Sequence, residues 1–338
     1  MKIVSWNLKN IGYSKLQNKF STTFSSYGLG GNVLSYITNL VMGSGNWNNI
    51  TNLSTNPADV FVVIELKTGG NQKGKTISGT CLPTLTAIRD AMNLASNARY
   101  GNLDSFKYAY ATPVITGYHE TVGVIYNTVT LNLQSFYVFR NNTNQKWINP
   151  RTPGGAQFQV KADSSTFQVV GIHAPPPKGG NPDLKYKPPI QYCNVLQTIN
   201  PATMSNTFYM GDFNCNPDST YEKNSGGMLI DVEPFTDLFS TGYKTNIPNG
   251  TLSSVRNKLA SGQTGQSQYL NDAYDNIIFN KSLTTGNSAE TVVDMIGNAR
   301  NMNATGTPIV FGSSPATSRS ILSMFNKVSD HLPVVIEW

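Results

Sequence analysis

The chain has 338 residues, of which 39% are hydrophobic and 10% aromatic, so it can bury a substantial core and is not a disordered protein. No run of about 18 apolar residues occurs, which excludes a membrane-spanning helix. Charged residues are only 13% of the chain and the formal net charge is +6. A basic excess on a weakly charged chain favours a polyanionic partner, with nucleic acid first and anionic lipid second.

The three cysteines, Cys81, Cys193 and Cys215, contain no Cys-x-x-Cys pair. This spacing excludes a zinc ribbon, a thioredoxin-like site and a disulfide scaffold. The first residues alternate as a strand does, and no secretory signal peptide is recognisable. Localisation stays open, and the low charge is compatible with a secreted or delivered effector.

Short apolar runs bounded by turn residues predict strands, several of them buried on both faces. In chain order they are Lys2–Trp6, Asp59–Ile64, Thr121–Tyr126, Phe167–Ile172, Thr207–Met210, Asn276–Phe279 and Leu332–Ile336. Apolar residues at helical spacing predict helices at Val33–Val41, Leu82–Leu94 and Pro189–Ile199. Strands that alternate with helices indicate an α/β architecture. Composition does not change across the long loops, so we expect one domain over residues 1–338 with surface loop insertions.

Reactive and amide side chains recur at the ends of these predicted strands. They are Asn7, Glu65, His173, Asp212, Asn214, Asp275, Asn276, Asp330 and His331. In an open α/β sheet, ligands bind where strand ends converge, so these side chains predict one shared site.

The predicted site is rich in hard oxygen ligands. Glu65 and Asp330 offer carboxylates, and Asn7 and Asp212 can add further oxygens. This set suits Mg²⁺ or Mn²⁺ and does not suit zinc, because histidines and thiolates do not cluster at ligand spacing. A metal beside histidines with carboxylate partners is the apparatus for hydrolysing a phosphate ester.

A series of segments matches, in order along the chain, the motifs of a known superfamily. They are Ile3–Leu8, Val63–Lys67, Tyr118–Tyr126, Gly171–His173, Tyr209–Asn214, Asn271–Asn276 and Ser329–Val334. On these residues the sequence resembles the endonuclease/exonuclease/phosphatase superfamily, and within it the deoxyribonuclease I family most closely. The resemblance implies a four-layer α/β/β/α sandwich of two packed mixed β-sheets. It also implies a divalent-metal-dependent endonuclease that hydrolyses DNA phosphodiester bonds.

The resemblance also implies roles for the metal-binding residues. Asn7 and Glu65 would hold the metal and the scissile phosphate, with Asp330 as a further ligand. Asp212 and Asn214 would contact phosphate and the attacking water. We expect Mg²⁺ or Mn²⁺ as the cofactor, with Ca²⁺ as an alternative.

Each histidine is expected to have its own carboxylate partner. The resemblance pairs His173 with Glu120 and His331 with Asp275. In such pairs the carboxylate fixes the imidazole tautomer and raises its pKa. We favour His331 as the base and His173 as the residue that assists the leaving group, and the symmetry of the pair leaves the reverse assignment open. The neighbouring His119 should point to the opposite face of its strand.

Basic residues beside the motifs indicate DNA as the partner. Lys9, Lys67 and Arg151 are expected to contact phosphates, together with Asn276. None of them is a strong candidate for reading base edges, so we expect little sequence specificity. The alternative is a phospholipid phosphodiesterase, such as a sphingomyelinase, or a phosphatase; an exposed apolar hairpin would favour lipid, and none is convincing in the sequence. We expect a monomer without stable membrane insertion and infer no protein partner.

Overall fold

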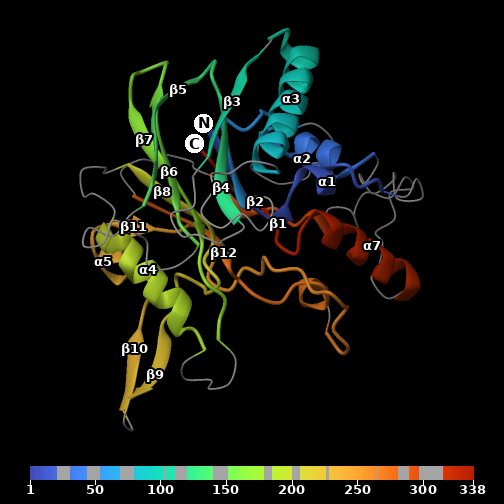
Figure 1. Ribbon diagram of the computed structural model, residues 1–338. Helices are drawn as coiled ribbons and strands as arrows, with labels where there is room; N and C mark the ends of the chain where they lie inside the picture. Colours follow the sequence, from blue (N-terminus) through green and yellow to red (C-terminus); the bar gives the residue numbers. More distant parts are fainter. Residues whose placement is uncertain are drawn as a thin grey trace.

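The computed structural model describes residues 1–20, 31–43, 54–68, 80–102, 104–110, 120–139, 151–178, 185–199, 206–225, 228–263, 265–280, 289–296 and 315–338. Two six-stranded mixed sheets pack against each other (Figure 1). The first sheet has the order β13 (Ala289–Val292), β14 (Val334–Glu337), β1 (Lys2–Ile11), β2 (Val60–Lys67), β4 (Glu120–Asn127) and β3 (Phe106–Tyr110). The second has the order β11 (Tyr243–Lys244), β12 (Asp275–Asn280), β8 (Thr207–Asp212), β7 (Thr166–His173), β6 (Gly154–Val160) and β5 (Leu131–Val138).

Helices cover the outer face of each sheet. Beside the first sheet lie α1 (Tyr13–Leu16), α2 (Val33–Val41), α3 (Cys81–Tyr100) and α7 (Pro315–Val328) (Figure 1). Beside the second lie α4 (Lys187–Ile199) and α5 (Thr236–Ser240), and Tyr192 and Leu196 of α4 pack with the outward-facing Ile172 and Tyr209. This arrangement is the expected α/β/β/α sandwich, so the fold prediction is confirmed.

Two further elements lie outside these layers. A short 3₁₀ helix spans Gly265–Gln268. Strands β9 (Tyr221–Ser225) and β10 (Met228–Val232) form a separate antiparallel hairpin that projects away from the sandwich (Figure 1). None of the helices that the structure describes is long and apolar enough to cross a membrane.

The two sheets approach closely where the site residues emerge. Gly171 of β7 faces the first sheet, and a Cβ atom placed on it would lie 2.9 Å from Cγ1 of Val62 and would also collide with Val122. Glycine is therefore required by the inter-sheet packing at this position. Because His173 follows two residues later on the same face of β7, this contact sets the position of its side chain relative to the first sheet.

The predicted strands all fall within or overlap observed ones, and most observed strands extend further toward the site. The helix predicted at Val33–Val41 has the same bounds as α2, where Asn32 and Ser35 form a reciprocal capping box. The helix predicted at Leu82–Leu94 extends to Tyr100, where Gly101 ends it in a left-handed conformation. Strands β3, β6 and β13 and helix α7 have no counterpart among the predictions. The aromatic segment Phe136–Phe139, which we expect to form a buried strand, overlaps β5.

Candidate active site

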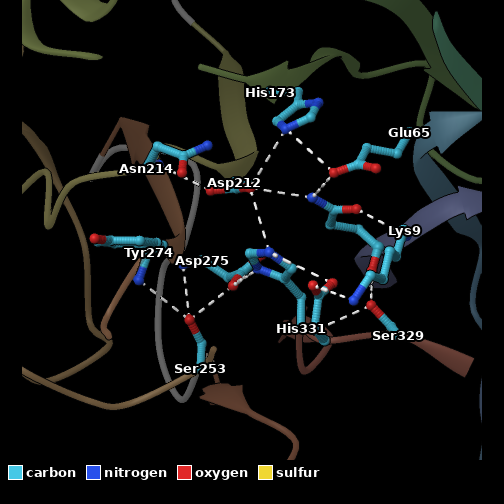
Figure 2. A network of polar contacts seen from close by, with 12 residues as sticks. Lys9, Glu65, His173, Asp212, Asn214, Ser253, Tyr274, Asp275, Ser329 and His331 are labelled. Atoms are coloured by element: carbon cyan, nitrogen blue, oxygen red, sulfur yellow. Dashed lines mark hydrogen bonds and ion pairs between the residues drawn. The ribbon is translucent and has the colours of Figure 1, made fainter. Parts of the chain in front are cut away.

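Strand ends from both sheets bring the predicted residues together at one edge of the sandwich (Figure 2). The first sheet contributes Asn7 from β1, Glu65 from β2 and Glu120 from β4. The second contributes His173 from β7, Asp212 from β8 and Asp275 from β12, while Asn214 follows β8 and Asp330 and His331 precede β14. The convergence that we expected at strand ends is thus present in the structure.

Asp212 lies at the centre of this network, and only 1% of its surface is exposed. Its Oδ2 atom accepts a hydrogen bond from Nδ2 of Asn7 at 3.0 Å. The same oxygen lies 3.6 Å from Nε2 of His173 and 3.6 Å from Nε2 of His331. Its other oxygen accepts the backbone N–H of Asn214 at 2.8 Å. Burial raises the pKa of Asp212, an effect that the two imidazoles oppose.

His173 lies between two glutamates of the first sheet. Its Nε2 atom is 3.3 Å from Oε1 of Glu65, and its Nδ1 atom is 2.5 Å from Oε1 of Glu120. The Nδ1 contact is close but does not have the geometry of a hydrogen bond. Arg151 lies behind Glu120, with its Nε atom 3.4 Å from Oε1, and donates from Nη1 to the carbonyl oxygen of Ala174 at 2.6 Å. Glu120 is therefore shared between an imidazole and a guanidinium.

His331 is held by Asp275, whose Oδ2 atom lies 2.8 Å from Nδ1 of the imidazole. Burial lowers the pKa of His331, but the nearby carboxylates of Asp275 and Asp212 outweigh it and raise that pKa to about 10. The metal-free imidazole is therefore protonated at neutral pH and is a proton donor. We expect His331 to act as a base, and this role requires a bound cation whose positive charge lowers the pKa of the imidazole again.

Left-handed backbone conformations occur at three residues in or beside the site. Lys9 and Asn10 have φ of 44° and 54°, and Glu65 has φ of 57°. The strand registers shift at the same places, after Asn7 in β1 and after Val63 in β2. Such bulges re-aim side chains, and strained backbone of this kind is concentrated at functional sites.

Three residues that sequence reasoning missed support the site from behind. Lys15 donates from Nζ to the carbonyl oxygens of Leu8 and Lys9, at 2.6 and 2.7 Å, and burial lowers its pKa to about 8. Ser329 donates to the carbonyl oxygen of Asn7, and Ser253 donates to Asp275. Ser329 belongs to a motif that we had noted, but no local pattern marks Lys15 or Ser253.

The buried acids and histidines form two groups that could each hold a metal ion. They are Glu65 with His173 and Asp212, and Asp212 with Asp275 and His331, and in each group the ligand atoms lie within 4.8 Å of one another. A divalent cation fits this donor set, because burial already disfavours the negative charge of Asp212. Carboxylate oxygens dominate both groups, and no thiolate takes part.

The remaining predicted residues lie around this centre. The Nζ atom of Lys9 lies 2.7 Å from Oδ2 of Asp330; burial raises the pKa of Asp330, but His331 and Lys9 hold it below its usual value. Lys67 is exposed at the end of β2. Asn276 is buried, and its side-chain oxygen accepts from Thr245 at 2.6 Å. His119 lies outside the described residues.

Two expected metal ligands have other partners in this structure. Asn7 presents its amide nitrogen to Glu65 and Asp212, while its oxygen accepts the backbone N–H of Lys9 at 3.0 Å. Asp330 lies in neither of the two metal-binding groups among the described residues. Their roles as ligands stay predictions.

The fold is shared with solved proteins of low sequence identity. A conserved protein of unknown function from Enterococcus faecalis V583 is 12% identical, with a TM-score of 0.51 over 100% of this chain and 98% of that chain. An endonuclease/exonuclease/phosphatase family protein from Leptotrichia buccalis C-1013-b is 14% identical, with a TM-score of 0.50 over 100% of this chain and 98% of that chain. No family model and no curated protein sequence matches the chain. The two structures show that the chain has the endonuclease/exonuclease/phosphatase fold.

Proposed function

We propose that this chain is a metal-dependent phosphodiesterase that cleaves DNA with little sequence specificity and acts as one domain over residues 1–338. Within the fold that it shares with the endonuclease/exonuclease/phosphatase proteins, we assign it to the deoxyribonuclease I-like enzymes. One observation carries the proposal: two imidazoles, each beside a different carboxylate, lie at equal distances of 3.6 Å from the same oxygen of the buried Asp212.

This symmetry suits the hydrolysis of a phosphodiester bond. In-line displacement needs one group to activate water on one side of phosphorus and another to protonate the leaving oxygen on the other side. His173 with Glu120 and His331 with Asp275 supply such a pair. We assign the contact with water to Asp212 and Asn214, because the Asn214 backbone orients the Asp212 carboxylate. A bound phosphate and cation change the charge around the two imidazoles, and this charge decides which imidazole accepts the proton from water and which protonates the leaving oxygen.

We assign the cation to Glu65 and Asp212, with Asn7 holding both carboxylates in place through its amide nitrogen. A divalent cation bound there would neutralise charge on the phosphate and acidify bound water. Mg²⁺ or Mn²⁺ fits carboxylate ligands best, and Ca²⁺ is the alternative. Asn10 supports this assignment, since its backbone N–H donates to Oε2 of Glu65 at 2.9 Å and so limits rotation of the carboxylate.

The substrate assignment rests on the basic residues at the rim. Lys67 is the last residue of β2, and Lys9 lies two residues before the end of the parallel neighbour β1, on the same side as the site. Arg151 adds a third positive charge beside Glu120. With a net charge of +6, this rim favours a polyanion whose phosphates lie on both sides of the bond that is cut.

One feature favours the alternative substrate, a phospholipid. The β9–β10 hairpin projects from the sandwich (Figure 1), and β10 contains the consecutive apolar residues Met228, Leu229 and Ile230. A hairpin that projects from the sandwich is an element through which a lipid-directed enzyme could meet a lipid surface. Sequence reasoning did not find this hairpin, because the apolar run is short.

One side-by-side assay separates the two substrates. We expect the protein to nick supercoiled plasmid in the presence of Mg²⁺ and to leave sphingomyelin vesicles intact, and chelation with EDTA should abolish nicking. Replacing Leu229 by Ser should not change nicking. Intact plasmid beside hydrolysed vesicles would replace the nuclease proposal by the phospholipase alternative, and Leu229→Ser should then reduce activity on vesicles.

A further inference from the structure

The hydroxyl group of Ser253 lies behind the Asp275–His331 pair, on the side away from Asp212 (Figure 2). Ser253 is fully buried and comes from a loop that belongs to neither sheet. Its backbone joins the two segments that carry the pair: Ser253 N–H donates to the carbonyl oxygen of Asp272 at 2.8 Å, and its own carbonyl accepts from Leu332 N–H at 2.8 Å. The loop is therefore fixed relative to both Asp275 and His331.

The hydrogen bonds around Ser253 determine which acceptor its hydroxyl group donates to. The Oγ atom accepts the backbone N–H groups of Asp275 at 2.9 Å and of Tyr274 at 3.2 Å, which occupy its two lone pairs. Its proton can then go to Oδ2 of Asp275 at 2.7 Å or to the carbonyl oxygen of Asp272 at 3.5 Å. The shorter bond to a carboxylate is much the stronger.

The carboxylate oxygen of Asp275 that accepts the hydrogen bond from Ser253 is also the oxygen that contacts His331. Oδ2 of Asp275 lies 2.7 Å from Oγ of Ser253 and 2.8 Å from Nδ1 of His331. A carboxylate held by one partner can rotate about its Cβ–Cγ bond, whereas two donors on the same oxygen restrict that rotation. The angle at which Asp275 meets the imidazole therefore depends on the serine.

We propose that Ser253 is a positioning residue of the active site, which orients His331 through Asp275 and so keeps Nε2 of His331 directed at Asp212. Ser253 does not touch the substrate and moves no proton to it. The effect of Ser253 is on the orientation of His331. This proposal rests on the proposed function only in the experiment that measures turnover.

The neighbouring Ser254 provides a matched control. It is also buried, and its Oγ atom has no hydrogen-bond partner in the structure. Ser254→Ala therefore removes the same atom from the same loop without removing a contact to Asp275. Comparison of the two alanine variants isolates the contribution of the Ser253 hydroxyl.

The first measurement needs no metal and no substrate. In the metal-free protein, the Nδ1 proton of His331 that is bonded to Asp275 should give a downfield proton NMR signal. We expect this signal to persist in Ser254→Ala and to broaden or disappear in Ser253→Ala. An unchanged signal in a folded Ser253→Ala protein would overturn the proposal.

The second measurement is plasmid nicking at saturating Mg²⁺. Ser253→Ala should lower kcat on the order of 10- to 100-fold relative to Ser254→Ala, the usual scale for a misplaced catalytic group, and change KM by less than about twofold. Ser253→Cys keeps a donor at this position, although a weaker one on a larger atom, and should fall between them. Both measurements can be made on Ser253→Cys if Ser253→Ala does not fold. A kcat equal to that of Ser254→Ala in both variants would contradict the positioning role. A wild-type protein that cleaves no phosphodiester would instead refute the proposed function and leave the NMR test in place.

Discussion

The Nε2 atom of His331 lies 3.6 Å from Oδ2 of Asp212, and the exposed fractions of the two side chains are 12% and 2%. A buried cation beside a buried anion is stable only while both charges are present. Asp275 adds a second negative charge on the other side of the imidazole. The protonation state of His331 therefore affects stability, and in the proposed mechanism it also affects catalysis.

The first prediction concerns stability at high pH. The pKa of His331 is raised from 6.5 to about 10 in the folded protein, so folding favours its protonated form. Its contribution is fully present below about pH 6.5 and is lost as the pH rises through 10. We expect the free energy of unfolding of the metal-free protein to fall more steeply between these values in the wild type than in His331→Gln. Parallel profiles from urea denaturation would contradict the assigned charge.

The second prediction concerns the two histidines. His173→Ala and His331→Ala should each lower kcat about 10²- to 10⁴-fold, the usual contribution of general acid–base catalysis. Because both imidazoles serve one transition state, the double variant should be much less impaired than the product of the single effects. The surface variant Lys107→Ala, at the opposite end of the first sheet, should match the wild type. Near-normal turnover in a folded single variant would remove that histidine from the mechanism.

The third prediction concerns the cation. Glu65→Gln should weaken Mn²⁺ or Mg²⁺ binding, as measured by calorimetry without substrate, because it removes a carboxylate from one of the two acidic groups. Asp163→Asn removes an exposed carboxylate from the turn at the far end of β7 and serves as the control for a change in charge alone. Equal affinities in the two variants would exclude Glu65 as a ligand.

The fourth prediction concerns DNA binding. Each phosphate contact contributes a slope of about −0.9 to the logarithm of affinity against the logarithm of salt concentration. Lys67→Ala should reduce the magnitude of the slope by about this amount and weaken binding to all sequences alike. Lys107→Ala is the control, since its side chain is exposed but lies away from the site. An unchanged slope in Lys67→Ala would show that Lys67 does not contact phosphate.

The fifth prediction concerns Glu290 on the edge strand β13. Its Oε2 atom accepts the backbone N–H of Asn246 at 2.7 Å, and burial raises its pKa to about 8. Its stabilising contribution is therefore complete below pH 4.5, its ordinary pKa, and is lost as the pH rises through 8. Glu290→Gln keeps an acceptor and cannot ionise, so its melting temperature should exceed that of the wild type at about pH 9 and not at about pH 5. The same difference at both values would contradict a titration of Glu290.

Local patterns were sufficient for the elements that are buried along their whole length. β2 was predictable because its apolar run is continuous, and α2 because Asn32 marks its start and apolar residues recur at helical spacing. The edge strand β5 was harder, because the aromatic segment Phe136–Phe139 predicts a buried strand, whereas Phe136 and Tyr137 are partly exposed. An edge strand has only one neighbour, so residue types alone do not reveal its burial.

The convergence of the candidate site residues was predictable because each lies at or beside a strand end that has a recognisable local pattern. The sequence by itself determined that imidazoles, carboxylates and amides would meet at one edge of the fold. Only the tertiary structure decided how they meet. Ser253 and His331 share one oxygen of Asp275, and both imidazoles point to one oxygen of Asp212. Both relations depend on the packing of the two sheets and on the bulges at Asn7 and Glu65. No local sequence pattern determines these relations, because they join segments far apart in the chain through contacts of a few ångströms.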